Sequence, residues 1–221
     1  DKCKRGDNSF VTYVRNNCSK TEIEGGIWVC GRNITVSNKN SEELAKIEGK
    51  LHTSIARYHG KCDKSDKLCD EVFEYKIGAR VVMLANDNVS GAYQNGTLAT
   101  IVGVAKDMIR IELDNGKRHL VGKQKISKYE YSYKESVSVV NQNGQNVEKT
   151  TKKLSQKEIG YAEQYPMRLG YAVTIHKSQG QTYDKMNLNP EIFSKGQLYV
   201  ALSRCRSIEN LYIKGFITNR M

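Results

Sequence analysis

The chain has only two prolines and one tryptophan among its 221 residues, and its acidic side chains are outnumbered by basic ones. It has no apolar run of the ~20 residues that a bilayer-spanning helix needs, and no signal-peptide pattern opens it. We therefore expect no membrane partner and a cytoplasmic, bacterial-type intracellular protein. The six cysteines form no C-x-x-C pair, which excludes the usual zinc site, so no bound metal is predicted. Cys62 and Cys69 could cross-link, although loop thiols are the favoured interpretation.

The sequence also lacks the glycine-rich phosphate cradle of a self-sufficient nucleotide hydrolase, G-x-x-x-x-G-K-[ST]. Its four Gly-Lys pairs begin at positions 49, 60, 116 and 122, and none has the required upstream glycine or following hydroxyl residue. We therefore predict that the chain cannot by itself hold a nucleotide in the usual way. Because the sequence starts at Asp1 in the middle of a polar segment, we expect a piece of a longer protein.

A large basic excess is the strongest compositional feature. Thirty-five Lys and Arg against twenty-four Asp and Glu give a formal charge of +11 and a pI of about 9.3. Such a charge favours a polyanionic partner such as nucleic acid, because each neutralised phosphate releases counterions. A merely solvated, lysine-rich surface explains the charge equally well, so the motifs must decide.

Two segments with α/β character enclose a β-rich middle. Residues 27–30 are typical of a buried strand and lead into an expected helix over 33–48, with Asn33 as a suitable N-cap. The α/β pattern resumes with an expected strand over 169–175. Short strands are predicted between these segments at 78–84, 96–104, 108–113 and 119–121, with tight turns about 114–116 and 143–144. Many short strands at close spacing indicate an inserted small barrel or sandwich.

Two dense polar segments carry the expected chemistry. Thr174–Thr182 reads TIHKSQGQT after an apolar run, and a glycine-bearing turn of this kind leaves backbone N–H groups and hydroxyls to meet phosphate oxygens. Gly196–Arg206 reads GQLYVALSRCR, and Ser194 with Gln197 has the spacing of a capping box. The buried stripe of the expected helix is formed by Leu198, Ala201, Leu202 and Cys205. Arg204 lies off that stripe and is expected to point into a cleft.

The insertion has basic clusters beside alternating aromatics. Tyr129, Tyr131 and Tyr133 follow the first cluster, and residues 117–128 and 149–157 contain no acidic side chain. Basic residues interleaved with aromatics can hold single strands by charge and stacking. A solvated barrel surface with core tyrosines on one face explains the pattern almost as well.

The two dense segments together resemble motifs V and VI of superfamily 1 helicases, most closely the PIF-type and RecD-like branch. The first motif corresponds to Gln164-Tyr165-Pro166, Leu169, Ala172, Thr174 to Gly180 and Thr182, and the second to Gly196 to Arg206. Gly31-Arg32-Asn33 resembles the strand-to-helix motif that opens the second motor domain. Gly78 to Met83 with Asn95-Gly96 resembles the entry to the SH3-like insertion of that family.

The resemblance implies an α/β fold, a RecA-like domain without the Walker A motif, with an inserted SH3-like β-barrel. The expected limits are 1–84 and 166–221 for the motor domain and 85–165 for the insertion. ATP and Mg²⁺ would be bound mainly by a preceding N-terminal RecA-like domain that carries Walker A and B, and the chain alone would be inactive. Arg204 would be the arginine finger, and Gly180 and Thr182 would lie near the nucleotide.

The same resemblance assigns contacts with single-stranded DNA to Thr174, His176, Lys177, Ser178, Gln179 and Asn33. The implied function is the C-terminal motor half of an ATP-dependent DNA helicase of 5′-to-3′ polarity. The alternative is a non-catalytic module, or adaptor, of helicase-like shape that binds single-stranded nucleic acid.

Overall fold

The computed structural model describes residues 8–66, 69–142, 145–191 and 196–215. Its residues fall into two compact units. The first unit comprises Asp1–His52, Tyr75–Val121 and Met167–Met221, and the second comprises Thr53–Glu74 and Gly122–Pro166. Within the described part of the chain, no helix is long and apolar enough to cross a membrane.

A parallel sheet organises the first unit. It consists of β1 (Ile27–Cys30), β12 (Ala172–Thr174), β13 (Met186–Asn189) and β14 (Leu211–Ile213), in the order β12-β1-β13-β14. Each neighbouring pair is parallel, and Cys30 lies opposite Thr174 in the register. All four residues of β1 are buried, as expected for a central strand that is covered on both faces.

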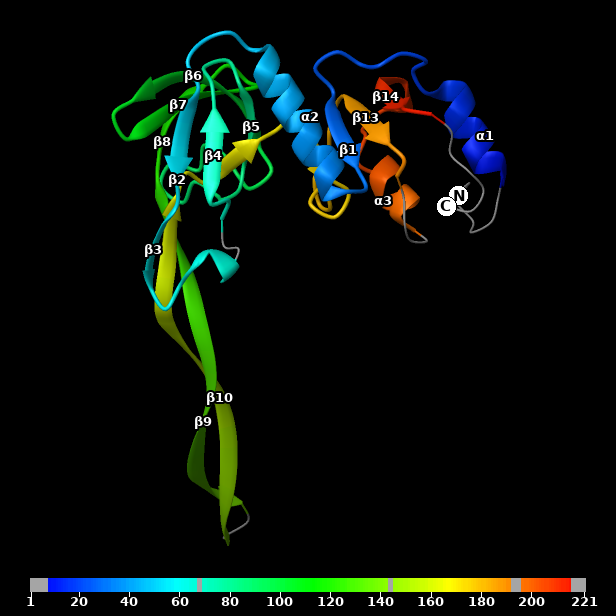
Figure 1. Cartoon of the computed structure of the whole chain (residues 1–221). Helices are drawn as coiled ribbons and strands as arrows, with labels where there is room; N and C mark the ends of the chain where they lie inside the picture. Colours follow the sequence, from blue (N-terminus) through cyan, green and yellow to red (C-terminus); the bar gives the residue numbers. More distant parts are fainter. Residues whose placement is uncertain (1–7, 67–68, 143–144, 192–195, 216–221) are drawn as a thin grey trace. The chain divides into compact units, whose positions relative to one another are not determined.

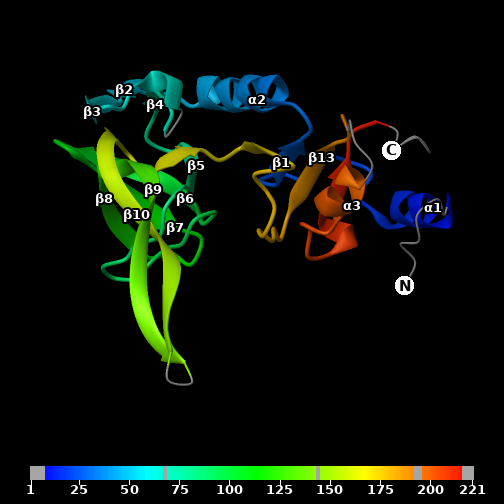
Figure 2. The ribbon, with the colours of Figure 1, turned by 90° about the horizontal axis from the view of Figure 1, so that it is seen from below.

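Helices cover both faces of this sheet. Ile27 and Val29 point to a core that includes Val14 of α1 (Asn8–Asn17) and Ala201 of α3 (Gln197–Leu202). Trp28 and Cys30 point to the other face, against Val36 of α2 (Asn33–Lys46). The alternation follows from the two-residue period of a strand. Figures 1 and 2 show α2 and the pair α1 and α3 on opposite sides of β1 and β13.

An antiparallel sheet forms the rest of the first unit. Its strands are β11 (Met167–Leu169), β5 (Arg80–Met83), β6 (Leu98–Ala105), β7 (Met108–Leu113) and β8 (Arg118–Gly122), hydrogen-bonded in that order. The predicted turn over 114–116 is confirmed, because the Gly116 N–H donates to the Leu113 carbonyl at 2.8 Å. Gly116 has a φ of +79°, a value that only glycine adopts easily.

The second unit is built on a long hairpin. Its elements are β2 (His52–Ile55), β3 (Arg57–Gly60), η1 (Lys64–Asp66), β4 (Val72–Tyr75), β9 (Gln124–Gln142) and β10 (Gln145–Gln164). Strand β10 pairs with β9 over its whole length and with β3 only at residues 160–163, so the outer part of the hairpin is two-stranded. The hairpin predicted about 143–144 is confirmed, although those two residues lie outside the described ones.

The β-rich region departs from the expected closed barrel. Among the described residues no sheet closes on itself, and the five-stranded sheet has β11 and β8 at its two ends. Strand β5 pairs with β11 on one side and β6 on the other, so one sheet contains strands from either side of the expected limits of the insertion, 85–165. Those limits stay a prediction.

Three local expectations were wrong. The strand expected over 169–175 is two strands, because β11 pairs with β5 in the antiparallel sheet whereas β12 pairs with β1 in the parallel sheet. The N-cap of α2 is Arg32, which has an extended backbone and makes no side-chain cap, and Asn33 is the first helical residue. Helix α3 ends at Leu202 and has Gly196 as its N-cap, whereas Ser194 of the expected capping box lies outside the described residues.

Candidate nucleic-acid interface

The loop that follows β12 folds back on itself through its own hydroxyl groups. The Ser178 N–H donates to the Thr174 carbonyl at 3.0 Å, and the Ser178 hydroxyl donates to the Ile175 carbonyl at 2.7 Å. The Lys177 N–H donates to the Thr174 hydroxyl at 3.3 Å. These bonds wind residues 174–178 into a tight turn that begins at the edge of the sheet.

This turn divides the residues predicted to bind DNA into two groups. The side chains of His176, Lys177 and Gln179 are exposed. Ser178 is fully buried and Thr174 is 6% exposed, with its hydroxyl used inside the turn. Both hydroxyls therefore shape the loop, and their predicted contact with DNA stays a prediction.

Asn33 lies at the same edge of the sheet as the turn. Strands β1 and β12 are parallel neighbours that end together at Cys30 and Thr174, so the segments that follow both strands emerge side by side. Asn33 is exposed at the start of α2. Polar groups beyond the carboxyl ends of parallel strands are where α/β folds most often bind ligands.

The loop then crosses to the amino end of the sheet. Gly180 has a φ of +78°, and no atom lies within 4 Å of the position that a Cβ would take. Gln181 donates through its side-chain amide to the Asn95 carbonyl at 3.2 Å. A Cβ on Gly96 would lie 2.1 Å from the Gln181 side chain, so the loop before β6 fits closely around this glutamine. Gln181 lies inside the sequence motif, but sequence reasoning gave it no role.

Arg204 is held by its own domain just beyond α3. Its Nε donates to the Val200 carbonyl at 3.0 Å, one Nη to the Gln181 carbonyl at 3.2 Å, and the other Nη to the Ser203 hydroxyl at 2.9 Å. The residue is half-buried. A guanidinium has five N–H donors, so these bonds leave two to reach another acceptor. Arg204 therefore lies beyond the end of α3 and not on the expected helix, and its position at a cleft stays a prediction.

The two predicted motifs are joined by their backbones as well. The Tyr183 N–H donates to the Arg204 carbonyl at 2.8 Å, and the Arg206 N–H donates to the Tyr183 carbonyl at 3.0 Å. Burial raises the pKa of the Tyr183 phenol to about 12, and the positive charge of Arg204 offsets part of that effect. Arg206 itself forms an exposed ion pair with Asp184 at 2.7 Å.

A polar cavity of about 380 Å³ borders the far end of this loop. Its wall includes Gln181 and Thr182, together with Gly96 and the ion pair between Arg80 and Asp114, which is 2.8 Å long. Thr182 is exposed. Among the residues predicted to lie near a nucleotide, Thr182 thus lines the cavity, whereas Gly180 and Arg204 do not.

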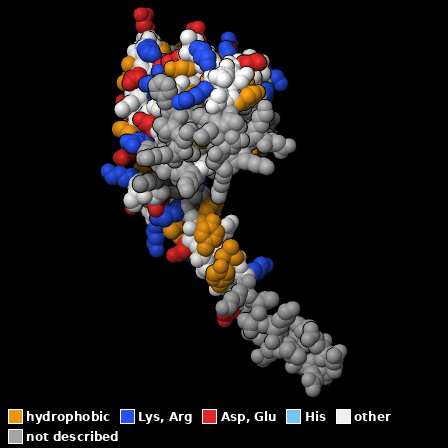
Figure 3. Space-filling view, turned by 90° about the vertical axis from the view of Figure 1, so that its right-hand side faces the viewer, with side chains coloured by type: hydrophobic (Ala, Val, Ile, Leu, Met, Phe, Trp, Pro, Cys, Tyr) orange, Lys and Arg blue, Asp and Glu red, His pale blue; other side chains and the backbone are white. Residues whose placement is uncertain are grey.

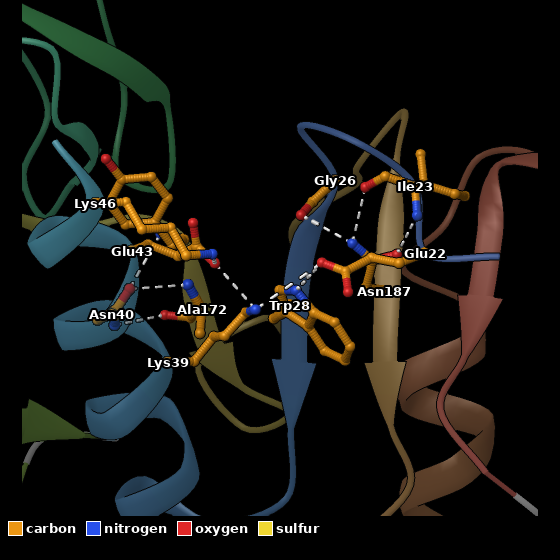
Figure 4. Close-up of polar contacts among 11 residues, drawn as sticks. Glu22, Ile23, Gly26, Trp28, Lys39, Asn40, Glu43, Lys46, Ala172 and Asn187 are labelled. Atoms are coloured by element: carbon orange, nitrogen blue, oxygen red, sulfur yellow. Dashed lines mark hydrogen bonds and ion pairs between the residues drawn. The ribbon is translucent and has the colours of Figure 1, made fainter.

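Two side-chain amides, of the half-buried Asn40 and the buried Asn187, hold backbone segments beside the parallel sheet, and sequence analysis missed both (Figure 4). The side-chain oxygen of Asn40 accepts from the Tyr171 and Ala172 N–H groups at 3.1 and 2.9 Å, and its NH₂ donates to the Ala172 carbonyl at 3.1 Å. Asn187 is 1% exposed and exchanges bonds with Ile23 at 2.9 and 3.0 Å. An asparagine in the middle of a helix was the only available signal, and many surface helices share it.

A lysine lies over the tryptophan on the α2 face of the sheet. Lys39 lies 5.0 Å from the centre of the Trp28 ring and 3.0 Å from Glu43, and the Trp28 indole donates to Glu22 at 3.2 Å. This group ties α2 to β1. Within the described residues no cluster of three or more His, Cys, Asp or Glu could hold a metal ion. The cysteines at 18, 30, 62, 69 and 205 are free thiols.

The covered parallel sheet and the polar loop beyond β12 define an α/β domain of the RecA-like superfamily. The chain's sequence homologues are ATP-dependent Pif1 DNA helicases, and its structural neighbours are structures of Pif1 helicases. No family model matches the sequence.

The four matches described next cover most of this chain but less than half of each relative. Pif1 of Bdellovibrio bacteriovorus is 27% identical over 202 residues, which is 88% of this chain and 40% of that protein. Pif1 of Campylobacter jejuni is 31% identical over 204 residues, 84% and 41% of the two chains. The unliganded structure of Pif1 from Bacteroides has a TM-score of 0.78 at 28% identity, over 98% of this chain and 48% of that one. Bacteroides Pif1 bound to single-stranded DNA gives 0.71 at 29% identity, over 97% and 46%.

Proposed function

We propose that this chain is the C-terminal motor half of an ATP-dependent DNA helicase with 5′-to-3′ polarity. The observation that carries the proposal is the bond between Arg204 and the Gln181 carbonyl, which joins the loop suited to grip DNA to the cation suited to act on ATP. The relatives named as ATP-dependent DNA helicases, and the Bacteroides relative bound to single-stranded DNA, support it.

In this proposal the loop after β12 grips the backbone of one strand. His176, Lys177 and Gln179 offer a cation and polar groups at an exposed turn, with Asn33 beside them at the same sheet edge. Phosphates look alike at every step, so such contacts suit a motor that moves along any sequence. The buried hydroxyls of Thr174 and Ser178 hold the turn in shape.

Arg204 would then act as the arginine finger across a shared cleft. ATP and Mg²⁺ would be bound mainly by an N-terminal RecA-like domain of the intact protein that carries Walker A and B, and Gly180 and Thr182 would face that nucleotide. A guanidinium brought from the opposite domain neutralises charge that develops on the transferred phosphoryl group. The β-rich insertion would correspond to the SH3-like insertion of the family.

The alternative is a module that binds single strands without catalysis. It is favoured by the three bonds that Arg204 already makes within its own domain, because a finger must spare donors for the phosphate. The discriminating experiment is an ATPase assay of the intact protein with and without single-stranded DNA. The helicase proposal expects strong stimulation by DNA and no hydrolysis by residues 1–221 alone. An intact protein that binds DNA yet never hydrolyses ATP is the outcome that favours the adaptor.

A further inference from the structure

Three tyrosines on one face of β9 are exposed to solvent. Tyr129, Tyr131 and Tyr133 are 43%, 61% and 73% exposed, and their spacing of two residues places them on one face of the strand. They lie beyond the register of β3, where the hairpin has only two strands. The interpretation of these residues as core tyrosines was therefore wrong, and packing in the core does not explain why three tyrosines lie here.

The facing strand extends this aromatic row. Leu154 lies opposite Tyr133, and Gln156 lies opposite Tyr131. Residues directly opposite each other in an antiparallel pair share a face, and Leu154 is 57% exposed. Figure 3 shows hydrophobic side chains along the exposed stem of the hairpin. We call Tyr129, Tyr131, Tyr133, Leu154 and Gln156 the tyrosine face.

The surroundings of the tyrosine face are basic. Residues 122–166 contain eight Lys and five Glu, without Arg or Asp. The acidic residue opposite Tyr129 is Glu158, whose charge is balanced by Lys125 at 2.5 Å and whose carboxylate accepts from the Ser127 hydroxyl at 2.6 Å. These contacts with Lys125 and Ser127 lower the pKa of Glu158. Lys153 and Lys157 are exposed on the same stretch of β10, on the opposite face of the hairpin, where Lys157 lies opposite Glu130. Their long side chains can reach around the hairpin edge toward an anion.

We propose that the tyrosine face is a second binding site for single-stranded DNA, which it holds by stacking bases on the rings. Successive side chains on one face of a strand are ~6.8 Å apart, and a base in a stack occupies ~3.4 Å, so one base fits between neighbouring rings with a stacking contact on each side. Every base has a π-face, so the site tolerates any sequence. Exposed lysines supply the complementary charge for the phosphates.

The proposal rests on the chain acting on single strands, but the site is separate from the loop after β12. The test uses residues 1–221 and a fluorescent oligo(dT), with affinity read by anisotropy. A matched oligonucleotide with abasic sites keeps the phosphates and removes the bases. We compare wild type with Tyr131→Leu/Tyr133→Leu, which keeps apolar bulk without rings, and with Tyr131→Phe/Tyr133→Phe, which keeps the rings.

We expect the leucine variant to bind oligo(dT) about five- to a hundredfold more weakly, as loss of base–aromatic stacking predicts, and the phenylalanine variant to bind normally. Wild type should prefer oligo(dT) over the abasic strand, and the leucine variant should lose that preference. Ser132→Ala, on the opposite face of β9, is the control and should change nothing. Thermal unfolding of all variants shows whether the hairpin substitutions leave the fold intact.

Each contrary result has a definite meaning. Unchanged affinity in the leucine variant overturns the proposal. Equal binding of oligo(dT) and the abasic strand by wild type also overturns it. If neither wild type nor the phenylalanine variant binds oligo(dT) through this face, and the face instead binds a protein, the tyrosine face is an apolar docking surface and the proposal fails. A His176→Ala/Lys177→Ala variant separates this site from the proposed motor function, because it should reduce binding of both oligonucleotides and leave the preference for bases unchanged.

Discussion

The Arg204 guanidinium donates through one Nη to the backbone carbonyl of Gln181 at 3.2 Å. Gln181 is also fixed on its other side, where its amide bonds to the Asn95 carbonyl at 3.2 Å. The loop that begins at the exposed Lys177 is thereby held at its far end by the arginine of the second motif. A displacement of either residue must move the other or break this bond, and in the proposed function this bond would link the strand grip to the nucleotide side.

The first prediction concerns Arg204 in the intact protein. Arg204→Ala should keep DNA and ATP binding but lose turnover by on the order of 10³-fold or more, because nothing else at that position supplies a cation. Steady-state ATPase assays with saturating single-stranded DNA measure this. The matched control is Arg206→Ala, whose exposed ion pair with Asp184 contributes little, so its turnover should be near normal. Near-normal hydrolysis by Arg204→Ala would exclude the finger role.

The second prediction separates contact residues from shaping residues in the loop. His176→Ala/Lys177→Ala should weaken single-strand binding and flatten its dependence on salt, with the slope falling by ~0.7 for each phosphate that the variant no longer neutralises. Ser178→Ala should keep the slope and instead lower the free energy of unfolding by about 1 kcal/mol, because the Ile175 carbonyl is left without its hydroxyl partner. Binding titrations at several salt concentrations, with urea unfolding, measure both quantities. A salt slope reduced only in Ser178→Ala would reverse these assignments.

The third prediction concerns alkaline pH. The Tyr183 phenol has a pKa of about 12 in the folded protein, whereas an unfolded tyrosine ionises near 10. A raised pKa stabilises the fold below pH 10, and this contribution is lost as the pH rises from 10 to 12. Tyr183→Phe should therefore lose less stability over that window, by roughly 2 kcal/mol. Urea unfolding at pH 8, 10, 11 and 12 tests this, with Tyr199→Phe, an exposed tyrosine, as the control. An equal dependence of the free energy of unfolding on pH in Tyr183→Phe and wild type would contradict the prediction.

The sequence predicted elements well where one local pattern decided them. The apolar run at residues 27–30, the helix from Asn33 and the turn over 114–116 all depend on neighbours in the chain, and all three formed as expected. The hairpin about residue 143 was equally visible from its turn residues and its alternation. In these four elements the structure favoured by the local sequence is the structure found in the fold, and such agreement is typical of sequences that fold readily.

Features that depend on distant contacts could not be predicted. The break between β11 and β12 arises because the two strands pair with different sheets, through partners far earlier in the chain that leave no local sign. The burial of Ser178 and the three bonds of Arg204 likewise depend on how the loop folds back. The motif thus predicted which loop to look at, and its role as a site stays a prediction; residue type alone did not separate the side chains that face outward from those that shape the turn.

The last prediction concerns Asn40, whose side chain makes hydrogen bonds with the edge strand β12 of the kind that a neighbouring strand would make. Strand β12 is at the edge of the parallel sheet, and the Asn40 side chain satisfies two N–H groups and one carbonyl at residues 171 and 172. Asn40→Ala leaves these partly buried groups without their partner and should cost roughly 2–4 kcal/mol in the free energy of unfolding. Amide hydrogen exchange at Tyr171 and Ala172 should accelerate with it, and urea unfolding measures the global loss.

The control for this variant is Asn38→Ala, on the exposed side of the same helix, which should change stability by no more than a few tenths of a kcal/mol. Because the loop that carries His176 and Lys177 begins where β12 ends, loosening the strand should also weaken single-strand binding, although Asn40 is on the helix behind it. Equal stability of the two variants would mean that water replaces the asparagine at the strand edge. Normal stability with weakened DNA binding would instead place Asn40 among the DNA contacts, against the geometry described above.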